Sequence, residues 1–192
     1  MFENTISFFY NLELACFNWL NHTIHNAVLD VIMPLLSYSG EAGLIWILLG
    51  LYLITFGKPE TKKAGVLMLV ALGASYLAGE CLKHTIERPR PFLSLTEVEL
   101  MVWPPGTYSF PSEHTANAFA VWFVLSRKQI RLSWLVALLA LAMAVSRAYV
   151  GVHYPFDILA GSVLGTACAA LVLKSENRLM RATNKITPPL NR

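Results

Sequence analysis

The residues with the clearest chemical potential lie between positions 146 and 157, a polar segment flanked by apolar runs. Ionisable groups are costly near hydrocarbon, so a cluster at the end of a membrane segment is usually functional. His153 and Asp157 are four residues apart and Pro155 suits the first turn of a helix, which would place the carboxylate one turn below the imidazole. Arg147 adds a fork of donors for an oxyanion, so the three predict a phosphate pocket with a histidine nucleophile. A histidine at a helix start that Asp157 caps is the plainer alternative.

Two further polar segments could belong to the same pocket. Lys83 and Arg90 offer a point charge and a planar fork, which together suit the oxygens of a phosphate, although basic residues also anchor helix ends at interfaces. Pro111 ends a loop, and Ser112 can be the N-cap of a helix whose free N–H groups and dipole attract anions. His114 in that first turn could donate a proton to the same anion. A plain N-cap followed by solvated residues is the alternative here.

The composition indicates a membrane protein. Of 192 residues, 55% are hydrophobic and 14% charged, whereas soluble domains carry about 25% charged residues. One domain is expected, because no linker, repeat or low-complexity segment divides the chain. The cysteines, Cys16, Cys81 and Cys168, lie in apolar surroundings at no metal-like spacing, so we expect them to pack rather than to bind or pair.

The expected fold is all-α: a polytopic membrane helix bundle of five or six spans with an N-terminal interfacial helical region, residues 1–40. Residues 6–24 are aromatic and apolar but interrupted by polar positions, and no basic stretch precedes them as in a cleaved signal peptide. They form either a poor first span or, as we expect, an amphipathic helix at headgroup level. His22 and His25 are then expected to be solvated, and residues 30–40 to form a short helix closed by glycine.

Residues 41–175 are expected to form the membrane-embedded domain, and residues 176–192 a basic cytoplasmic tail. The predicted spans cover residues 39–56, 64–82, 112–126, 132–145 and 156–173, close to the length that crosses a bilayer. Small residues of the second span would let a neighbouring helix approach closely: Gly73, Ala74, Ser75, Ala78 and Gly79. Residues 83–111 are polar, rich in proline and not expected to span.

The basic residues predict the orientation of these spans. Four of the 15 Lys and Arg residues lie in the polar segments, and these are Lys83, Arg88, Arg90 and Arg147. All the others lie in loops 57–63 and 127–131 or from residue 174 onward, which the positive-inside rule assigns to the cytoplasm. The polar segments are therefore expected to be extracytoplasmic, whether the N-terminus lies outside with five spans or inside with six.

The three polar segments together resemble the signature of the type 2 phosphatidic acid phosphatases, also called the lipid phosphatase and vanadium haloperoxidase superfamily. That signature is Lys, six residues, Arg-Pro; then Pro-Ser-x-His; then Ser-Arg, five residues, His, three residues, Asp. This chain contains all three parts in order, starting at Lys83, Pro111 and Ser146. The resemblance covers residues 40–175.

Two positions need comment against this signature. Arg88-Pro89 does not keep the spacing from Lys83 that Arg90-Pro91 keeps, so we interpret it as a decoy. Glu113 stands where the second motif usually has glycine. Its side chain narrows the approach of the backbone to phosphate and brings a negative charge near an anion, which bears on substrate choice.

The resemblance implies a mechanism. His153 attacks phosphorus, Asp157 holds the other ring nitrogen and His114 protonates the leaving oxygen. The groups implied to surround the phosphate are Lys83, Arg90, Ser112, Glu113 and Arg147, of which the cations neutralise its oxygens. No carboxylate cluster with the spacing of a divalent-metal site occurs in the extracytoplasmic segments, so neither a metal nor another cofactor is expected.

The expected substrate is a lipid phosphate in the membrane, with no nucleic acid partner. The chain most resembles small bacterial undecaprenyl-diphosphate phosphatases, which recycle the carrier lipid of cell-wall synthesis. Phosphatidylglycerophosphate and phosphatidic acid phosphatases share the motifs, and a non-catalytic transporter or lipid-binding protein of the same fold is a further alternative. A vanadate-dependent haloperoxidase is disfavoured, because those enzymes are soluble.

Overall fold

The protein is all-helical in the computed structural model, which describes residues 2–176. The α-helices are α1 (Phe2–Asn18), α2 (Leu29–Ser39), α3 (Leu44–Phe56), α4 (Pro59–Ile86), α5 (Pro91–Ser94), α6 (Glu113–Arg127), α7 (Ser133–Tyr149) and α8 (Pro155–Lys174). A π-helical turn, η1 (Trp19–Thr23), follows α1, and a 3₁₀ turn, η2 (Glu41–Gly43), joins α2 to α3. The all-α class is thus confirmed, whereas the predicted tail lies outside the described residues except for residue 176.

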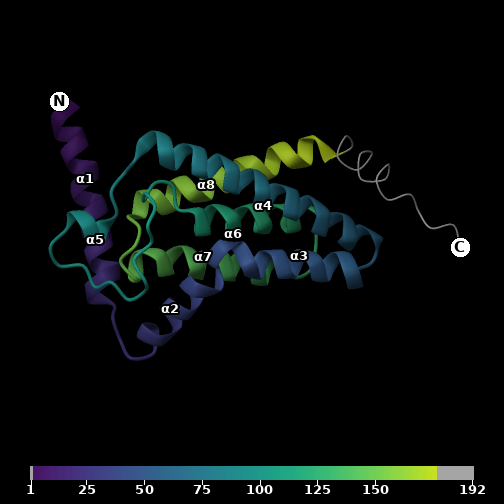
Figure 1. Ribbon diagram of the computed structural model, residues 1–192, viewed down its shortest axis with the longest axis horizontal. Coiled ribbons are helices and arrows are strands. Elements are labelled where there is room, and N and C mark those ends of the chain that lie inside the picture. Colours follow the sequence, from purple (N-terminus) through teal and green to yellow (C-terminus); the bar gives the residue numbers. More distant parts are fainter. Residues whose placement is uncertain (1, 177–192) are drawn as a thin grey trace, which may run out of the picture.

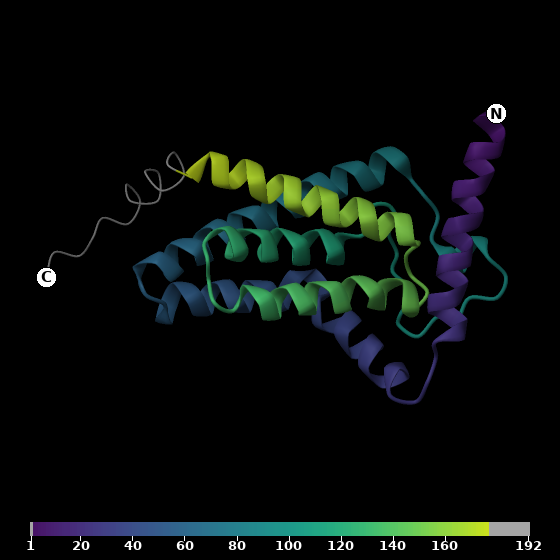
Figure 2. The ribbon, with the colours of Figure 1, turned by 180° about the vertical axis from the view of Figure 1, so that it is seen from behind.

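Five helices form a bundle along the long axis of the molecule: α3, α4, α6, α7 and α8 (Figures 1 and 2). Helix α6 lies at its centre and packs against α4, α7 and α8. Helix α1 crosses one end of the bundle at a steep angle, beside α5 and the loop that contains it (Figure 1). Helices α4 and α7 finish at this same end, where α6 and α8 begin, so residues far apart in the sequence meet there.

The apolar surface of the bundle places the protein in a membrane. Among the described residues, Pro59–Ser94 and Pro155–Lys174 are long and apolar enough to cross a bilayer, and the bent pair Leu29–Ser39 and Glu41–Phe56 could supply a third span. Large apolar side chains are exposed along the bundle, among them Leu48, Phe56, Leu77, Trp134, Leu138, Val163 and Leu171. Such a surface suits lipid, because burial in hydrocarbon is as favourable for these side chains as burial in protein.

Helix α1 packs on the bundle through one polar and aromatic face. Its buried residues recur every four positions, as expected for one side of a helix: Glu13, Phe17 and Asn21, the last in the π-helical turn. The aromatic residues on its other sides are exposed, including Phe8, Phe9, Tyr10 and Trp19. This pattern gives α1 one face that packs on the bundle and other faces that expose aromatic side chains, and the interfacial position of residues 1–40 remains a prediction.

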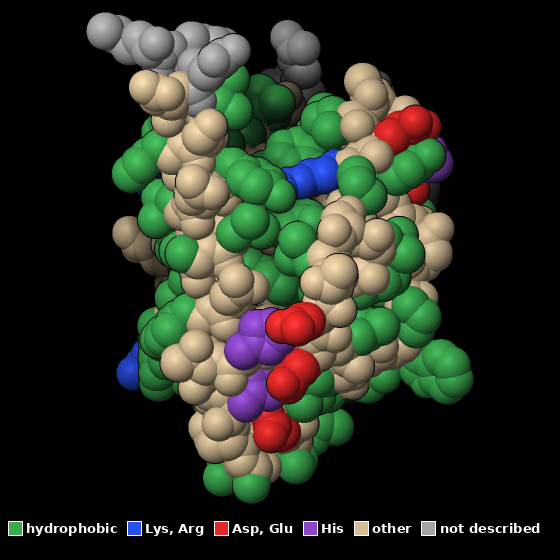
Figure 3. Space-filling view, turned by 90° about the vertical axis from the view of Figure 1, so that its left-hand side faces the viewer, with side chains coloured by type: hydrophobic (Ala, Val, Ile, Leu, Met, Phe, Trp, Pro, Cys, Tyr) green, Lys and Arg blue, Asp and Glu red, His purple; other side chains and the backbone are tan. Residues whose placement is uncertain are grey.

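Histidine and acidic side chains adjoin one another on this end of the molecule, as Figure 3 shows. His25 Nδ1 lies 3.1 Å from Asp30 Oδ1 and 3.2 Å from Glu99 Oε2, and the His25 ring stacks on Tyr149 with 4.2 Å between centroids. The prediction that His25 is solvated was therefore wrong. It followed from the polar surroundings of His25 in sequence, whereas its packing partner comes from α7.

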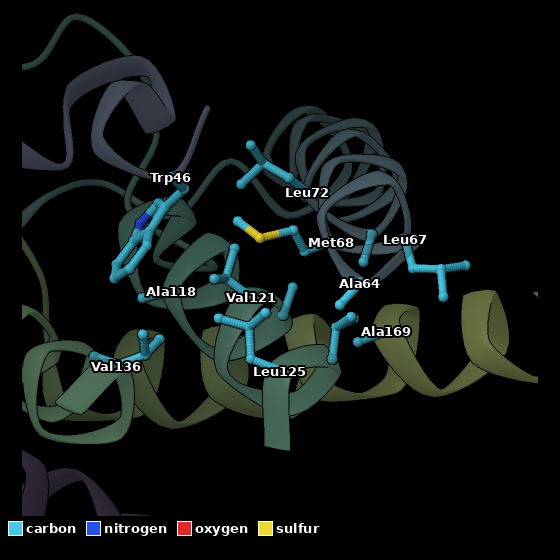
Figure 4. Close-up of a cluster of buried hydrophobic side chains, with 14 of the residues drawn as sticks. Trp46, Ala64, Leu67, Met68, Leu72, Ala118, Val121, Leu125, Val136 and Ala169 are labelled. Carbon is cyan, nitrogen blue, oxygen red and sulfur yellow. The ribbon is translucent and has the colours of Figure 1, made fainter. Parts of the chain in front are cut away.

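The core of the bundle is a cluster of apolar side chains around α6 (Figure 4). Val121 and Leu125 of α6 meet Met68 of α4, Val136 of α7 and Trp46 of α3 in this cluster. Every one of these side chains is almost fully buried. Because lipid is as apolar as this core, close van der Waals packing rather than expulsion of water holds the helices together.

Helices α6 and α8 approach so closely that glycine is required at two positions of α8. A Cβ added at Gly165 would lie 1.9 Å from the Ala116 carbonyl oxygen, and one at Gly161 would lie 2.4 Å from the Ser112 carbonyl oxygen. Of the small residues predicted to let a helix approach α4, Gly73 faces open space, because an added Cβ would meet no atom within 4 Å, whereas a Cβ at Gly79 would lie 3.9 Å from Leu164 of α8. The close contact instead involves glycines four residues apart on α8, a known pattern in membrane helices.

A break between α2 and α3 corrects the predicted uniform span 39–56. The two helices meet at 55°, and the turn between them contains two residues with positive φ, Ala42 at 49° and Gly43 at 69°. Glycine adopts this conformation without steric cost, whereas alanine does not. Helix α2 itself ends at Ser39 and is capped by Gly40, as predicted. The break leaves Glu41 at the end of the bundle where α6 begins.

Candidate active site

A cavity of about 340 Å³ lies at the end of the bundle, where α4, α6, α7 and the loops before α5, α6 and α8 converge. Six residues predicted for the site line it: Lys83, Arg90, Glu113, His114, Arg147 and His153. Lys83 lies in the last turn of α4 rather than in a loop, because α4 continues to Ile86. The N-terminal ends of α6 and α8 point to this region, and their helix dipoles favour an anion here.

His153 and Asp157 form the predicted pair, but not as neighbours on one helix. His153 lies in the loop before α8, which begins at Pro155, and Asp157 lies in the first turn of that helix. The His153 Nδ1 atom is 3.6 Å from Asp157 Oδ2. The same Oδ2 accepts hydrogen bonds from the Ser109 hydroxyl and, at 2.9 Å, from the Tyr154 backbone N–H. These bonds direct the carboxylate toward the ring.

The other ring nitrogen of His153 faces the cavity. Arg90 Nη1 lies 3.2 Å from His153 Nε2 and can donate a hydrogen bond to it when the ring proton is on Nδ1, toward Asp157. Burial lowers the pKa of His153 to about 3, the nearby Arg90 and Arg147 charges lower it further, and the Asp157 carboxylate opposes them. The imidazole is therefore neutral at pH 7, which is the form that has a free lone pair on Nε2 for attack.

Both arginines of the cavity are held by hydrogen bonds to neighbouring groups. Arg90 donates from Nε to the Thr107 carbonyl oxygen at 2.6 Å and from Nη1 to the Val152 carbonyl oxygen at 2.9 Å. Arg147 donates from Nη1 to the Ser37 hydroxyl. The buried Arg147 Nε has no hydrogen-bond partner among the described residues. Fixed guanidinium groups with donors at a cavity suit the bidentate binding of a phosphate.

Lys83 is paired with two carboxylates at the edge of the cavity. Its Nζ lies 2.7 Å from Glu113 Oε2 and 2.8 Å from Glu80 Oε1. Glu113, the residue that replaces the usual glycine, thus contacts one of the cations implied to bind phosphate. An anionic ligand that approached Lys83 would compete with both carboxylates, so these residues reduce the net positive charge of this side of the cavity.

His114 lies across the cavity near the break between α2 and α3. Its buried Nε2 atom has no hydrogen-bond partner among residues 2–176, and Glu41 Oε2 is 3.8 Å away. A Cβ added at Gly40 would lie 2.7 Å from His114 Cδ2, so the missing side chain makes room for this ring. The second histidine therefore reaches the same cavity as His153 from a different helix.

Ser112 is the predicted phosphate-binding residue that does not line the cavity. Its hydroxyl is buried 3.0 Å from the Thr115 hydroxyl, and its backbone N–H donates to the Asp157 carbonyl oxygen at 3.0 Å. It occupies the N-cap position of α6, but its side chain makes no capping hydrogen bond. In this arrangement Ser112 joins the start of α6 to the start of α8.

Sequence reasoning missed two residues near the site, Arg88 and Glu13. Arg90 rather than Arg88 lines the cavity, in keeping with the motif spacing, but Arg88 also contacts the site, because its Nη1 atom lies 2.6 Å from Asp157 Oδ1. Glu13 of α1 binds the same guanidinium group. One signal was available in the sequence. Arg88 is one of four cations in the segments expected to be extracytoplasmic, where the positive-inside rule gives no reason for a basic residue.

The fold and the cavity together define a helical membrane protein that can bind a phosphate group among two histidines and three cations. The family model described as the PAP2 superfamily matches residues 64–181, and the chain belongs to this superfamily. Its members are phosphatases, and so is this protein.

Relatives and solved structures agree with this assignment. The chain is 30% identical over 176 residues to a protein of Sulfolobus acidocaldarius named undecaprenyl-diphosphatase, a match that covers 91% of this chain and 82% of that one. The crystal structure of Aquifex aeolicus LpxE aligns with a TM-score of 0.74 at 30% identity, over 85% of this chain and 95% of that chain. The PAP2 type phosphatidylglycerolphosphate phosphatase of Bacillus subtilis aligns with a TM-score of 0.68 at 25% identity, over 88% and 86% of the two chains.

Proposed function

We propose that this protein hydrolyses undecaprenyl diphosphate to undecaprenyl phosphate and inorganic phosphate through a phosphohistidine intermediate. The observation that carries the proposal is the position of His153, which lines one cavity together with Lys83, Arg90 and Arg147 and whose Nε2 lies 3.2 Å from Arg90. A neutral nucleophile among fixed cations suits attack on a phosphate, because the cations stabilise the negative charge of the transition state. The name of the Sulfolobus acidocaldarius relative supports the choice of lipid.

In the first step His153 Nε2 attacks the terminal phosphorus, and the bond from phosphorus to the bridging oxygen breaks. The phosphoryl group is then on Nε2, and undecaprenyl phosphate is the leaving group. Asp157, at 3.6 Å from Nδ1, stabilises the positive charge that the ring gains. His114, which lines the same cavity, is protonated when the anionic substrate is bound and donates its proton to the leaving oxygen.

In the second step a water molecule attacks the phosphohistidine. The bond from phosphorus to Nε2 breaks, inorganic phosphate leaves, and His153 returns to its neutral form. His114, deprotonated in the first step, accepts a proton from the attacking water and so regains its starting state. One histidine thus carries the phosphoryl group while the other carries the proton in both directions.

The cations of the chain account for charge neutralisation without a metal ion. Lys83, Arg90 and Arg147 occupy the positions around the phosphate that metal ions take in many phosphoryl-transfer enzymes. We therefore propose a metal-independent reaction. Phosphate release that persists in EDTA supports this proposal, whereas loss of activity that one divalent ion restores contradicts it.

The place of the cavity in the bundle favours a lipid over a soluble phosphate ester. It lies at the end of helices whose flanks expose apolar side chains, so a phosphate in the headgroup layer can enter while its tail remains in hydrocarbon. We propose that this end is extracytoplasmic and that the bundle crosses the membrane five or six times. The loops with most of the basic residues lie at the opposite end, as the positive-inside rule requires.

Phosphatidylglycerophosphate is the second candidate substrate, because the Bacillus subtilis neighbour acts on a lipid of that name. The structure offers one feature that bears on the choice. Glu80 and Glu113 pair with Lys83 and reduce the positive charge of the cavity edge, so less positive charge is left to stabilise the departure of a strongly basic leaving group. A diphosphate needs less help from the enzyme, because its leaving group is a weaker base than an alkoxide.

The test is phosphate release by the purified protein in detergent from undecaprenyl diphosphate, phosphatidylglycerophosphate and phosphatidic acid. We expect the highest kcat/KM with undecaprenyl diphosphate. A preference for either phospholipid contradicts the choice of substrate but keeps the reaction class. The absence of a phosphohistidine after rapid acid-free quenching of labelled substrate contradicts the covalent mechanism.

A further inference from the structure

Arg88 joins two carboxylates from distant parts of the chain. Its Nη1 atom lies 2.6 Å from Asp157 Oδ1, and its Nη2 atom lies 2.6 Å from Glu13 Oε2. The Nη1 atom also lies 3.1 Å from the second Glu13 oxygen, which completes a two-point contact. The guanidinium carbon stacks 4.0 Å above the ring of Tyr154. Arg88 therefore has a fixed orientation, with one carboxylate on each side.

Glu13 is buried at the end of the bundle although it is charged. Its side chain is 3% exposed, and besides Arg88 it accepts a hydrogen bond at 3.1 Å from the Phe156 backbone N–H in the first turn of α8. A buried carboxylate is strongly unfavourable unless it is paired and hydrogen-bonded. These contacts satisfy Glu13, and they connect α1 directly to the helix that carries Asp157.

The bonds of Asp157 come from three different segments. Arg88 binds Oδ1, while the Ser109 hydroxyl and the Tyr154 N–H bind Oδ2, the oxygen that faces His153. Each bond restricts rotation of the Asp157 side chain and so keeps Oδ2 directed at the ring. Because Glu13 in turn fixes Arg88, the carboxylate is oriented through a chain of contacts that begins in the N-terminal helix.

We propose that Glu13 and Arg88 are positioning residues that hold Asp157 against His153, so that α1 forms part of the catalytic machinery. This inference rests on the roles proposed above for Asp157 and His153. The pair acts through Asp157 and contacts neither the cavity nor the phosphate, because neither residue lines the cavity. Its removal should therefore lower kcat and leave KM unchanged.

A purely structural function of the pair, fastening α1 to the bundle, makes a different prediction. Asn21, in the π-helical turn that continues α1, fastens the same N-terminal region and makes no hydrogen bond to Arg88 or Asp157. Its side-chain amide donates to the carbonyl oxygens of Tyr149 at 2.7 Å and Glu99 at 2.9 Å, and its carbonyl accepts from the Glu99 N–H. Asn21→Ala is thus a matched control that loosens α1 but leaves the contacts of Asp157 in place.

The experiment compares Glu13→Gln, Arg88→Gln and Asn21→Ala with the unmodified protein, each after size-exclusion chromatography in detergent. We expect a 10- to 100-fold loss of kcat with unchanged KM for Glu13→Gln and Arg88→Gln, a range typical of groups that orient a functional residue. Asn21→Ala should keep kcat within about twofold while lowering the unfolding temperature. If Arg88→Gln does not fold, Arg88→Lys replaces it in the experiment. This variant keeps the charge but not the planar fork, and its kcat should fall as well.

A double-mutant cycle with Asp157→Asn separates positioning from fastening. If Arg88 acts through Asp157, then Arg88→Gln should cost little further kcat in the Asp157→Asn background, because the oriented group is already gone. Equal losses in both backgrounds, or equal losses in Asn21→Ala and Glu13→Gln, would overturn the inference. Normal activity in Asp157→Asn would overturn the proposed mechanism instead, so the two failures are distinguishable.

Discussion

At the scale of single residues, the two histidines of the cavity differ in what surrounds them. One nitrogen of His153 is 3.2 Å from Arg90 and the other is 3.6 Å from Asp157, beyond hydrogen-bond distance, whereas the buried Nε2 of His114 has only Glu41 nearby, at 3.8 Å. The first environment places a carboxylate on one side of the ring and a guanidinium on the other, an arrangement that suits a nucleophile. The second leaves a nitrogen free to exchange a proton at the cavity.

Substitution of each histidine should therefore give a different defect. His153→Ala should abolish turnover and the covalent phosphoenzyme, because no other described group is placed to attack. His114→Ala should lose about 100- to 10,000-fold in kcat, the usual cost of removing a general acid. Its defect should be milder on undecaprenyl diphosphate than on phosphatidic acid, whose leaving alkoxide needs the proton more. The measurement is kcat on both lipids together with phosphoenzyme trapping.

Asp157→Asn tests the partner of the nucleophile. It should keep the fold but lose most activity, because the amide can hold the ring in the wrong tautomer and cannot stabilise the imidazolium. His84, which is exposed and does not line the cavity, is the matched control, and His84→Ala should stay near normal. Near-normal activity in His153→Ala would overturn the whole assignment, whereas equal His114→Ala defects on both lipids would overturn only the leaving-group argument.

The low pKa of His153 predicts a pH dependence of stability. An unfolded histidine binds a proton below about pH 6.5, whereas burial keeps His153 neutral in the folded protein down to about pH 3. Between these values the unfolded chain binds more protons, so this residue lowers the stability of the fold as the pH falls from 6.5. His153→Gln should reduce the slope of apparent unfolding temperature against pH between pH 4 and pH 7. Identical slopes in the two proteins would contradict the buried neutral state.

At the scale of elements, the contact between α6 and α8 sets the geometry of the site. Helix α6 carries His114 in its first turn and α8 carries Asp157 in its first turn, and the two starts are joined by the bond from the Ser112 N–H to the Asp157 carbonyl oxygen. The glycines of α8 allow this spacing along the next turns. A change in the distance between these helices would therefore move the general acid relative to the group that orients the nucleophile.

Gly165→Ala tests this dependence, because its Cβ would collide with the Ala116 backbone oxygen, an atom that cannot move aside as a side chain can. We expect a loss of about 1–3 kcal/mol or more in stability, typical of overpacking, together with reduced activity. Gly73→Ala is the matched control, since its Cβ would meet no atom within 4 Å. The readouts are unfolding temperature in detergent and kcat. Similar behaviour of both variants would show that the close approach is unimportant.

The sequence predicted the motif residues of this site better than the elements that support them. The motif residues could be predicted because their types and their spacings can be read directly from the sequence. They are Lys83, Arg90, His114, Arg147 and His153. The contacts of Glu13 with Arg88 and of Gly165 with α6 were not found, because they join residues dozens of positions apart. The start of α3 was predicted too early for a different reason: the helix closed by Gly40 was expected, but a span of membrane length had to begin near residue 39, and hydropathy does not report the positive φ of Ala42 and Gly43.

At the scale of the whole molecule, the described basic residues lie in two groups, one at each end of the bundle. Lys83, Arg88, Arg90 and Arg147 are engaged at the end with the cavity. At the other end Lys63 and Lys128 both bind Glu176, at 2.7 and 2.5 Å, which draws together the loops at 57–63 and 127–131 and the end of α8. The positive-inside rule would assign this second cluster to the cytoplasm.

The orientation that follows can be tested by labelling single cysteines. In a background with serine at Cys16, Cys81 and Cys168, we would place one cysteine at Thr96, exposed on the loop near the cavity, or at Glu60, exposed at the opposite end. A membrane-impermeant maleimide added to spheroplasts should modify Thr96→Cys at once and Glu60→Cys only after lysis. Both variants should retain phosphatase activity before labelling, since neither residue lines the cavity.

The reverse labelling pattern would place the cavity in the cytoplasm and remove the basis for an extracytoplasmic reaction. The labelling of a cysteine placed at Thr5, in the first turns of α1, then shows whether the N-terminal region lies in the interface or spans the membrane. If α1 lies in the interface beside the cavity, Thr5→Cys should be modified on the same side as Thr96→Cys, because both belong to the end that α1 crosses. Modification from the opposite side would mean that the N-terminal region spans the membrane, and the arrangement of α1 against Arg88 could not hold in the bilayer.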